Sequence, residues 1–319
     1  PIVRYSDVEK RIDHPDLNPY NAAKGFERFA IGLAKKVILA DTLAAVCDPI
    51  FDLPFDMRTS EVAWIGAIFY AFQICLDFSG YSDMAIGIGR MLGFEFPENF
   101  DRPYQSRSIT EFWRRWHMSL SSWFRDYVYI PLGGNRKGNV YLHLLIVFAL
   151  TGLWHGASWN FVMWGLTYGV IIVIERFFKK HVDIKLPDSS PIRGICSLVS
   201  WVYAMAVVGF EWVLFRCKSF HDALDYYKTM LGLTTCRFSP YRVRWYLNNM
   251  NLFILLVAVL VTIVPWKTIA GLFTARNGEA GRFALVKDVA IKICTAALLV
   301  LCLIYVMNST YSPFIYFQF

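Results

Sequence analysis

Long apolar runs separated by short polar connections dominate the hydrophobic pattern of the chain. An apolar run of about 20 residues crosses a bilayer as an α-helix, because a helix satisfies its backbone polar groups internally. The pattern predicts an all-α, multi-pass transmembrane protein with five or six spans, depending on whether an interrupted pair crosses once or twice. The runs are 62–78, 141–154, 161–174, 195–215, 252–264 and 289–307. The interrupted pair consists of 141–154 and 161–174.

The segment 24–46 has helical periodicity but is too charged for a simple span. We expect a helix that lies at the membrane surface or packs against other helices. Its charged side chains include Arg28, Lys35, Lys36 and Asp41. No repeat or linker divides the chain, so the pattern predicts one membrane domain over residues 1–319.

A second amphipathic segment follows Ser108 and Glu111, which have the spacing of a helix-initiating capping box. We expect one continuous helix from here to Pro131, either at the membrane interface with its tryptophans at headgroup depth or in contact with substrate. Its apolar stripe is Trp113, Trp116, Leu120, Trp123 and Tyr127, and its polar stripe is Arg114, His117, Ser121 and Arg125.

Composition supports a lipid environment, with 56% hydrophobic and 17% aromatic residues. This content excludes a disordered chain, and the seven cysteines form no disulfide framework. The net charge of +7 comes from residues between the apolar runs and beside Trp and Tyr. Such a distribution is typical of membrane-interface loops and argues against a nucleic-acid partner.

His155 is the sharpest candidate for chemistry, because it interrupts two apolar runs between Gly152 and Gly156. Ionisable groups at membrane depth are costly and are retained where they face a bundle interior or a water-filled cavity. The alternative is a histidine that only bonds a carbonyl freed at a helix break.

His117 lies among arginines, so a neutral imidazole that both donates and accepts hydrogen bonds is expected there. A structural and a functional histidine are equally compatible with this pattern. Asp77, Asp83 and Asp126 are candidates to orient either imidazole, but the sequence does not show which of them, if any, does so. The default interpretation is that these carboxylates are solvated or ion-paired. No Walker loop, HExxH motif or Cys/His zinc spacing occurs, so no metal site is predicted.

Three segments carry a resemblance to a known family. They read FWRRWHMSLSSWFRDYVYIPLGGNR, LTGLWHGASWNFVMWGLTYG and LDFSGYSDMAIGIGRMLGFEFPENFDRPYQSRSI. With them the chain resembles membrane-bound O-acyltransferases, in the branch that acetylates bacterial polysaccharides such as alginate, over essentially its whole length. The start at Pro1 resembles an internal position of that family, so N-terminal helices of the domain are expected to be missing.

The resemblance implies interfacial and broken helices around an intramembrane tunnel, with His155 as the catalytic general base and His117 as a supporting active-site residue. An acyl thioester, acetyl-CoA in the simplest case, would enter from the cytoplasmic side as a co-substrate, with no tightly bound cofactor. A hydroxyl acceptor would enter from the other side. The residues expected to contact substrate are Trp113, Arg114, Trp116 and Trp154.

The implied setting is the bacterial cell membrane, in contact with lipid. An extracellular esterase-like partner would pass the acyl group on to a polysaccharide acceptor. One alternative within the same family is D-alanyl transfer to teichoic acid. An alternative from another class of protein is a non-enzymatic transporter or scaffold of a polysaccharide export complex. In a transporter, His155 would relay protons and the broken helix would act as a gate.

Overall fold

The structure is a computed structural model that describes residues 1–182, 191–234, 236, 239–264 and 282–308. Every regular element in these residues is a helix, which confirms the all-α class. The N-terminal part forms α1 (Tyr5–Ile12), α2 (Pro19–Ala34), the π-helix η1 (Lys35–Ala40), α3 (Asp41–Phe51), η2 (Phe55–Met57) and α4 (Ser60–Met91). The middle part forms η3 (Pro103–Gln105), α5 (Ile109–Arg115), α6 (Met118–Phe124), the π-helix η4 (Arg125–Tyr129), α7 (Val140–His155) and α8 (Trp159–His181). The last part forms α9 (Pro191–Arg216), α10 (Phe220–Met230), α11 (Val243–Tyr246), α12 (Asn249–Ile263) and α14 (Arg282–Asn308).

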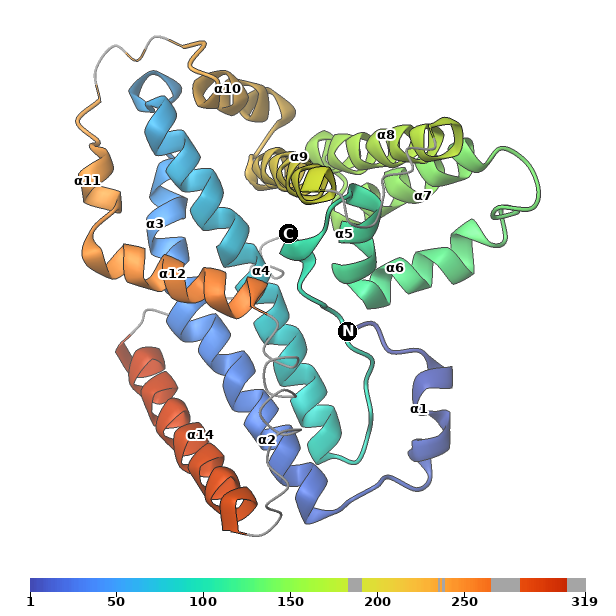
Figure 1. Cartoon of the computed structure of the whole chain (residues 1–319), viewed down its shortest axis with the longest axis vertical. Coiled ribbons are helices and arrows are strands. Elements are labelled where there is room, and N and C mark those ends of the chain that lie inside the picture. Colours follow the sequence, from blue (N-terminus) through green and yellow to red (C-terminus); the bar gives the residue numbers. More distant parts are fainter. Residues whose placement is uncertain (183–190, 235, 237–238, 265–281, 309–319) are drawn as a thin grey trace.

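The helices form two groups joined through α4 and α9. In Figure 1, α2, α4 and α14 run side by side, and α5 to α9 gather to their right. Two glycine pairs bring the backbones of α2 and α4 together. A Cβ added at Gly25 would lie 2.5 Å from the carbonyl oxygen of Gly87, and one added at Gly32 would lie 2.6 Å from that of Gly80. Side chains there would force the two helices apart.

Ion pairs that α2 and η1 make with α4 explain the charges in segment 24–46. Lys36 Nζ lies 2.8 Å from Asp77 Oδ1 and 2.8 Å from Asp41 Oδ1, and both Lys36 and Asp77 are buried. Nearly two turns further along α4, Asp83 pairs with Arg28 and Lys35. The helix therefore packs against another helix, the second of the two expected arrangements.

The interrupted apolar pair forms a helical hairpin. α7 ends at His155 and α8 begins at Trp159, so the break falls where the sequence predicts it. The helices touch through Gly165, because a Cβ there would lie 2.2 Å from the carbonyl oxygen of Phe148 and 2.9 Å from the amide nitrogen of Gly152. Such a close contact between backbones is typical of helix pairs with small residues at the crossing.

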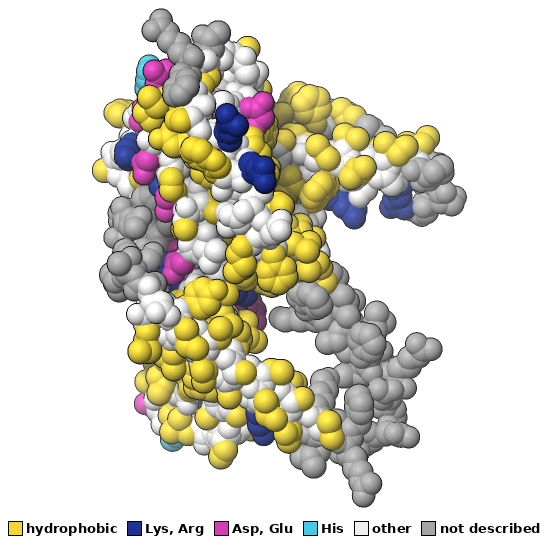
Figure 2. All heavy atoms as spheres, turned by 90° about the vertical axis from the view of Figure 1, so that its left-hand side faces the viewer, with side chains coloured by type: hydrophobic (Ala, Val, Ile, Leu, Met, Phe, Trp, Pro, Cys, Tyr) yellow, Lys and Arg dark blue, Asp and Glu magenta, His cyan; other side chains and the backbone are white. Residues whose placement is uncertain are grey.

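Four helices in the described part of the chain are long and apolar enough to cross a membrane, namely α4, α8, α9 and α14. The apolar window of α4 is 72% buried inside the protein, whereas that of α14 is 11% buried. Figure 2 shows hydrophobic side chains over much of the face that α12 and α14 help to form. Exposed residues on these two helices include Phe253, Leu256, Ile293, Val300 and Ile304. An apolar outer face of this kind suits contact with lipid, and the protein is a membrane protein by composition and fold.

The expectation of one continuous helix from Ser108 to Pro131 is wrong. Its start is as predicted, since the Ser108 hydroxyl accepts a hydrogen bond from the Glu111 N–H. The chain then breaks at Trp116 and His117, between α5 and α6, because tertiary contacts override a periodicity that runs through the break. Trp116 is buried rather than placed at headgroup depth.

We predict that Gly165→Ala destabilises the α7–α8 hairpin, because the added methyl group would collide with backbone atoms. Overpacking of this kind costs about 1–3 kcal/mol. Thermal unfolding of the full-length protein in detergent, followed by tryptophan fluorescence, should show a lower midpoint. Gly209→Ala on α9 is the matched control, since nothing lies within 4 Å of its added Cβ. Equal midpoints for the two variants would contradict the prediction.

Candidate functional site

The chain turns sharply between α5 and α6, and this turn presents His117. Trp116 is extended, whereas His117 has φ 46° and ψ 53°, in the left-handed region that is uncommon for a residue other than glycine. The Met118 N–H donates a 3.0 Å hydrogen bond to the backbone carbonyl of Asn99, in the loop 94–102 that follows α4. The loop therefore holds the turn in place through its backbone.

A buried polar network surrounds the His117 ring. Asn99 Oδ1 lies 3.2 Å from His117 Nδ1 and accepts hydrogen bonds from the N–H and the hydroxyl of Ser119. The other end of the amide, Nδ2, donates a 3.0 Å hydrogen bond to the hydroxyl of Ser82 on α4. All four residues are buried.

His155 lies at the C-terminal end of α7 in an aromatic setting. Its ring centroid is 4.9 Å from that of Trp154, 5.1 Å from that of Trp164 and 5.3 Å from that of Phe215, and each pair of rings is nearly perpendicular. Three aromatic rings therefore pack directly against this imidazole and give it a largely apolar setting.

The structure brings the two predicted catalytic histidines together. The indole of Trp154 contacts both rings, with its centroid 5.9 Å from that of His117. His117 lies between α5 and α6, outside the helices that are long enough to span the membrane. Burial lowers the pKa of His117 well below its ordinary value, and the charge of His155 lowers this pKa further. His117 is therefore neutral at physiological pH.

The predicted substrate-contact residues separate into three positions. Trp154 is 48% exposed and touches both histidines. Trp113 and Trp116 are buried in the aromatic core, and Trp113 meets Trp164, the ring that contacts His155, at 5.8 Å. Arg114 is exposed and lines two cavities instead of joining the histidines.

Two neighbouring cavities adjoin α5 and α8. The basic cavity, of about 990 Å³, is lined by five cationic side chains, and the apolar cavity, of about 550 Å³, is lined in part by Trp113, Phe148 and Thr151. The two share five lining residues, namely Thr110, Arg114, Tyr129, Leu144 and Ile172. The cationic side chains of the basic cavity are those of Arg107, Arg114, Arg176, Lys179 and Lys180.

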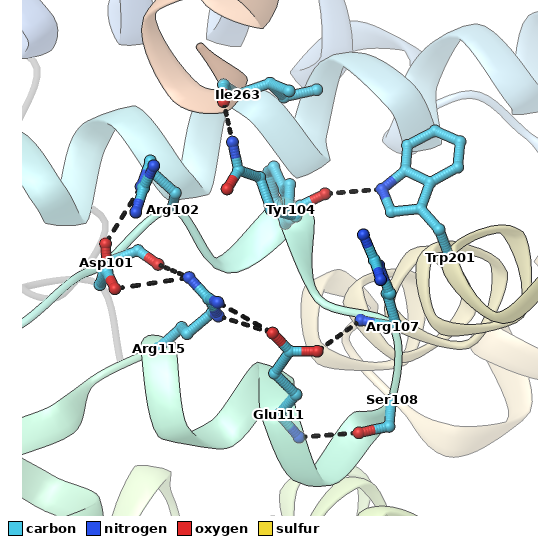
Figure 3. A network of polar contacts seen from close by, with 10 residues as sticks. Asp101, Arg102, Tyr104, Arg107, Ser108, Glu111, Arg115, Trp201 and Ile263 are labelled. Atoms are coloured by element: carbon cyan, nitrogen blue, oxygen red, sulfur yellow. Dashed lines mark hydrogen bonds and ion pairs between the residues drawn. The ribbon is translucent and has the colours of Figure 1, made fainter. Parts of the chain in front are cut away.

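The acidic groups of the basic cavity are already engaged. Glu111 pairs with Arg115 and accepts a hydrogen bond from the Arg107 N–H, as Figure 3 shows. Glu175 accepts hydrogen bonds from the N–H groups of Ile109 and Thr110 at the start of α5. The side chains of four of the cations, those of Arg107, Arg114, Lys179 and Lys180, make no hydrogen bond or ion pair with the described residues. The cavity thus has spare positive charge for an anionic ligand.

The carboxylates considered as orienting groups are held by cations. Asp77 pairs with Lys36, Asp83 with Lys35 and Arg28, and Asp126 with Arg4 and Arg125. The group at His117 Nδ1 is instead the amide of Asn99, which the sequence analysis did not single out. The only signal in the sequence near Asn99 is a single Asn beside Phe100, in the stretch FPENF.

The sequence of the chain matches one family. A model of the membrane-bound O-acyltransferase family matches residues 1–215, so the chain belongs to this family, and the resemblance seen in the sequence is confirmed. One relative is a probable alginate O-acetylase AlgI of Pseudomonas putida, 39% identical over 100% of this chain and 66% of its own length.

Two other relatives carry different names. A peptidoglycan O-acetyltransferase of Helicobacter pylori is 38% identical over 79% of this chain and 48% of its own length. A teichoic acid D-alanyltransferase of Bacillus subtilis is 33% identical over 48% of this chain and 40% of its own length. The chain thus spans between two fifths and two thirds of the length of these three curated relatives.

We predict that the buried neutral state of His117 makes the protein less stable in acid. The unfolded chain binds a proton at this residue below pH 6.5, whereas the folded protein does not until its lowered pKa is reached. The free energy of unfolding should therefore fall by about 1.4 kcal/mol per pH unit in that window, and be fully retained above pH 6.5. Unfolding midpoints measured between pH 7.5 and 5 should fall more steeply for the wild type than for His117→Gln. Parallel curves would rule out a contribution from this residue.

Proposed function

We propose that this protein is a membrane O-acyltransferase that passes an acetyl group from a cytoplasmic thioester to a hydroxyl acceptor, for modification of an extracellular polysaccharide. The observation that carries the proposal is the pairing of His155, at a helix break, with the buried His117 across Trp154. Family membership and the names of the acetylating relatives support the reaction class.

In the proposed reaction His155 is the general base. Its neutral imidazole takes the proton of the acceptor hydroxyl as the oxygen attacks the thioester carbonyl. The C–O bond forms, the C–S bond breaks, and the proton passes from the imidazolium to the leaving thiolate. The rings of Trp154, Trp164 and Phe215 lie around this imidazole and give the reaction a largely apolar setting. No protein nucleophile is required.

The basic cavity suits the binding of the acyl-thioester donor. Thioester carriers such as CoA bear phosphate groups, and Arg and Lys side chains bind phosphate through charge-assisted hydrogen bonds. Arg176, at the basic cavity, and Trp164, which contacts His155, are separated by about 18 Å along α8 at 1.5 Å per residue. A thioester at the end of an extended arm is suited to such a span. The apolar cavity, which adjoins Trp113, would cover part of the arm. The tunnel remains a prediction.

The acceptor side is proposed from the relatives. Alginate and peptidoglycan are the polymers named for the acetylating relatives, and both lie outside the cytoplasm of a bacterium. We assign the protein to the cell membrane as a multi-pass protein, with an extracellular esterase-like partner that completes transfer to the polymer. D-alanyl transfer is the second candidate, on the basis of the teichoic acid relative, whose match covers less of the chain. A transporter or a scaffold would show no acyl transfer.

We predict that His155→Ala abolishes acetylation of the extracellular polysaccharide in cells that carry the full-length protein. Removal of a general base lowers the rate by about 100- to 10,000-fold. The matched control is His221→Ala, because this histidine side chain is 81% exposed and lies on α10. Membrane expression should be equal for both variants. Persistent acetylation in His155→Ala would leave His155 a structural residue and favour the scaffold.

We also predict that the double variant Lys179→Gln, Lys180→Gln raises KM for acetyl-CoA by roughly three- to tenfold, because two exposed cations near phosphate each contribute up to about 1 kcal/mol. Turnover by the full-length protein in membrane vesicles should be little changed at saturating donor. The control pair Lys218→Gln, Lys228→Gln removes two exposed lysines elsewhere. High salt should likewise raise KM for acetyl-CoA in the wild type, because salt screens the attraction between charges. If the double variant raises KM but high salt does not, electrostatic binding is contradicted.

A further inference from the structure

The orientation of the Asn99 amide follows from its neighbours. A backbone N–H can only donate, and the Ser119 N–H points to one end of the amide at 3.2 Å, so that end is the carbonyl oxygen Oδ1. The opposite end is then the NH₂ group, which donates to the Ser82 hydroxyl. The Ser119 N–H fixes this orientation, because a flipped amide would place its NH₂ group against another donor, whereas the Ser82 hydroxyl can either donate or accept.

The amide orientation decides the proton position on His117. A carbonyl oxygen accepts only, so the ring nitrogen 3.2 Å from Asn99 Oδ1 must carry the hydrogen. In the neutral ring the proton is then on Nδ1, and Nε2 holds the lone pair. His117 is thus fixed in one tautomer by a buried partner, as an orienting group does for a catalytic imidazole.

We infer that Asn99 is a positioning residue of the acyl-transfer site: it holds His117 as the neutral Nδ1–H tautomer, with the lone pair on Nε2, while His155 takes the substrate proton. The inference rests on the proposed function for its catalytic meaning. It assigns His117 the role of the uncharged partner of His155. Two imidazolium rings that share contact with Trp154 would repel each other, so one must stay neutral when the other is protonated.

The side chain and the backbone of Asn99 have separate tasks. The backbone carbonyl accepts the Met118 N–H and holds the turn between α5 and α6, and this bond survives a change of side chain. The side chain bonds the His117 ring, Ser119 and Ser82. Substitution of Asn99 therefore tests the tautomer with the backbone anchor still present.

The first test reads the tautomer directly. The full-length protein, labelled with ¹⁵N-histidine and reconstituted in phospholipid bilayers, is studied by solid-state NMR, and His117→Gln identifies the His117 signals. We expect a protonated Nδ1 and an unprotonated Nε2 at pH 7.5 in the wild type, and a mixture of tautomers in Asn99→Ala. An Nε2–H tautomer in the wild type, or an unchanged Nδ1–H tautomer in Asn99→Ala, overturns the inference. This readout does not depend on acetyl transfer.

The second test uses steady-state transfer from acetyl-CoA by the full-length protein in membrane vesicles. Asn99→Ala should lower kcat by at least about tenfold with KM for acetyl-CoA within about twofold. Asn99→Asp should retain the acceptor for Nδ1–H but favour imidazolium at His117, so the acid limb of its kcat profile should move to higher pH. Identical pH profiles for the two variants would mean that the side chain only supports packing.

Asn251→Ala is the matched control, because its Nδ2 donates one hydrogen bond to the Tyr246 carbonyl, away from the histidines. It should keep the wild-type kcat and pH profile. If wild-type vesicles transfer no acetyl group, the proposed function fails, while the NMR result still decides whether Asn99 sets the tautomer of His117.

Discussion

The contact between α2 and α4 is the constraint on which the rest of the structure depends. Glycine pairs allow the two backbones to touch, and the Lys36–Asp77 pair then fixes one helix along the other. Removing one partner of a buried ion pair typically costs about 3–5 kcal/mol, because the remaining charge is left without compensation. The register of α4 is therefore tightly held.

The register of α4 also sets the positions of two of its residues that contact the candidate site. The ring of Phe78 packs against His117 at 4.7 Å, and Ser82, one turn further along, accepts the hydrogen bond from Asn99. Displacement of α4 by one residue would rotate both away from the turn between α5 and α6. The ion pairs at Asp77 and Asp83 flank these two site contacts along the helix, so the scaffold and the site share one element.

Much of the fold could be predicted from short segments of the sequence. The apolar runs predict α4, α7, α8, α9 and α12, because helix length and hydropathy in a membrane are set by the bilayer. The break at His155 was readable because polar residues and glycine interrupt the apolar pattern there. In contrast, the three- and four-residue spacing of Trp113, Trp116 and Leu120 runs on unbroken through a turn that the structure makes at His117.

The features that could not be predicted from the sequence are those that depend on contacts between residues far apart in the chain. The left-handed conformation of His117 depends on a backbone carbonyl of Asn99, and the role of the Asn99 amide depends on Ser82 and Ser119. None of these contacts has a periodic signature. Carboxylates were the candidate orienting groups, yet a neutral amide holds the ring without adding a charge that would favour imidazolium.

The attachment of the N-terminal segment to α6 has a consequence for biosynthesis. The Ile2 N–H donates to the Ser119 hydroxyl, 117 residues later, and Arg4 pairs with Asp126. Ribosomes add about 5–20 residues per second, so this segment waits about 6–23 s before its partner exists. During that interval α2 and α4 are already complete and can associate. Segment 2–4 therefore reaches its place beside Ser119 only after α6 has been made.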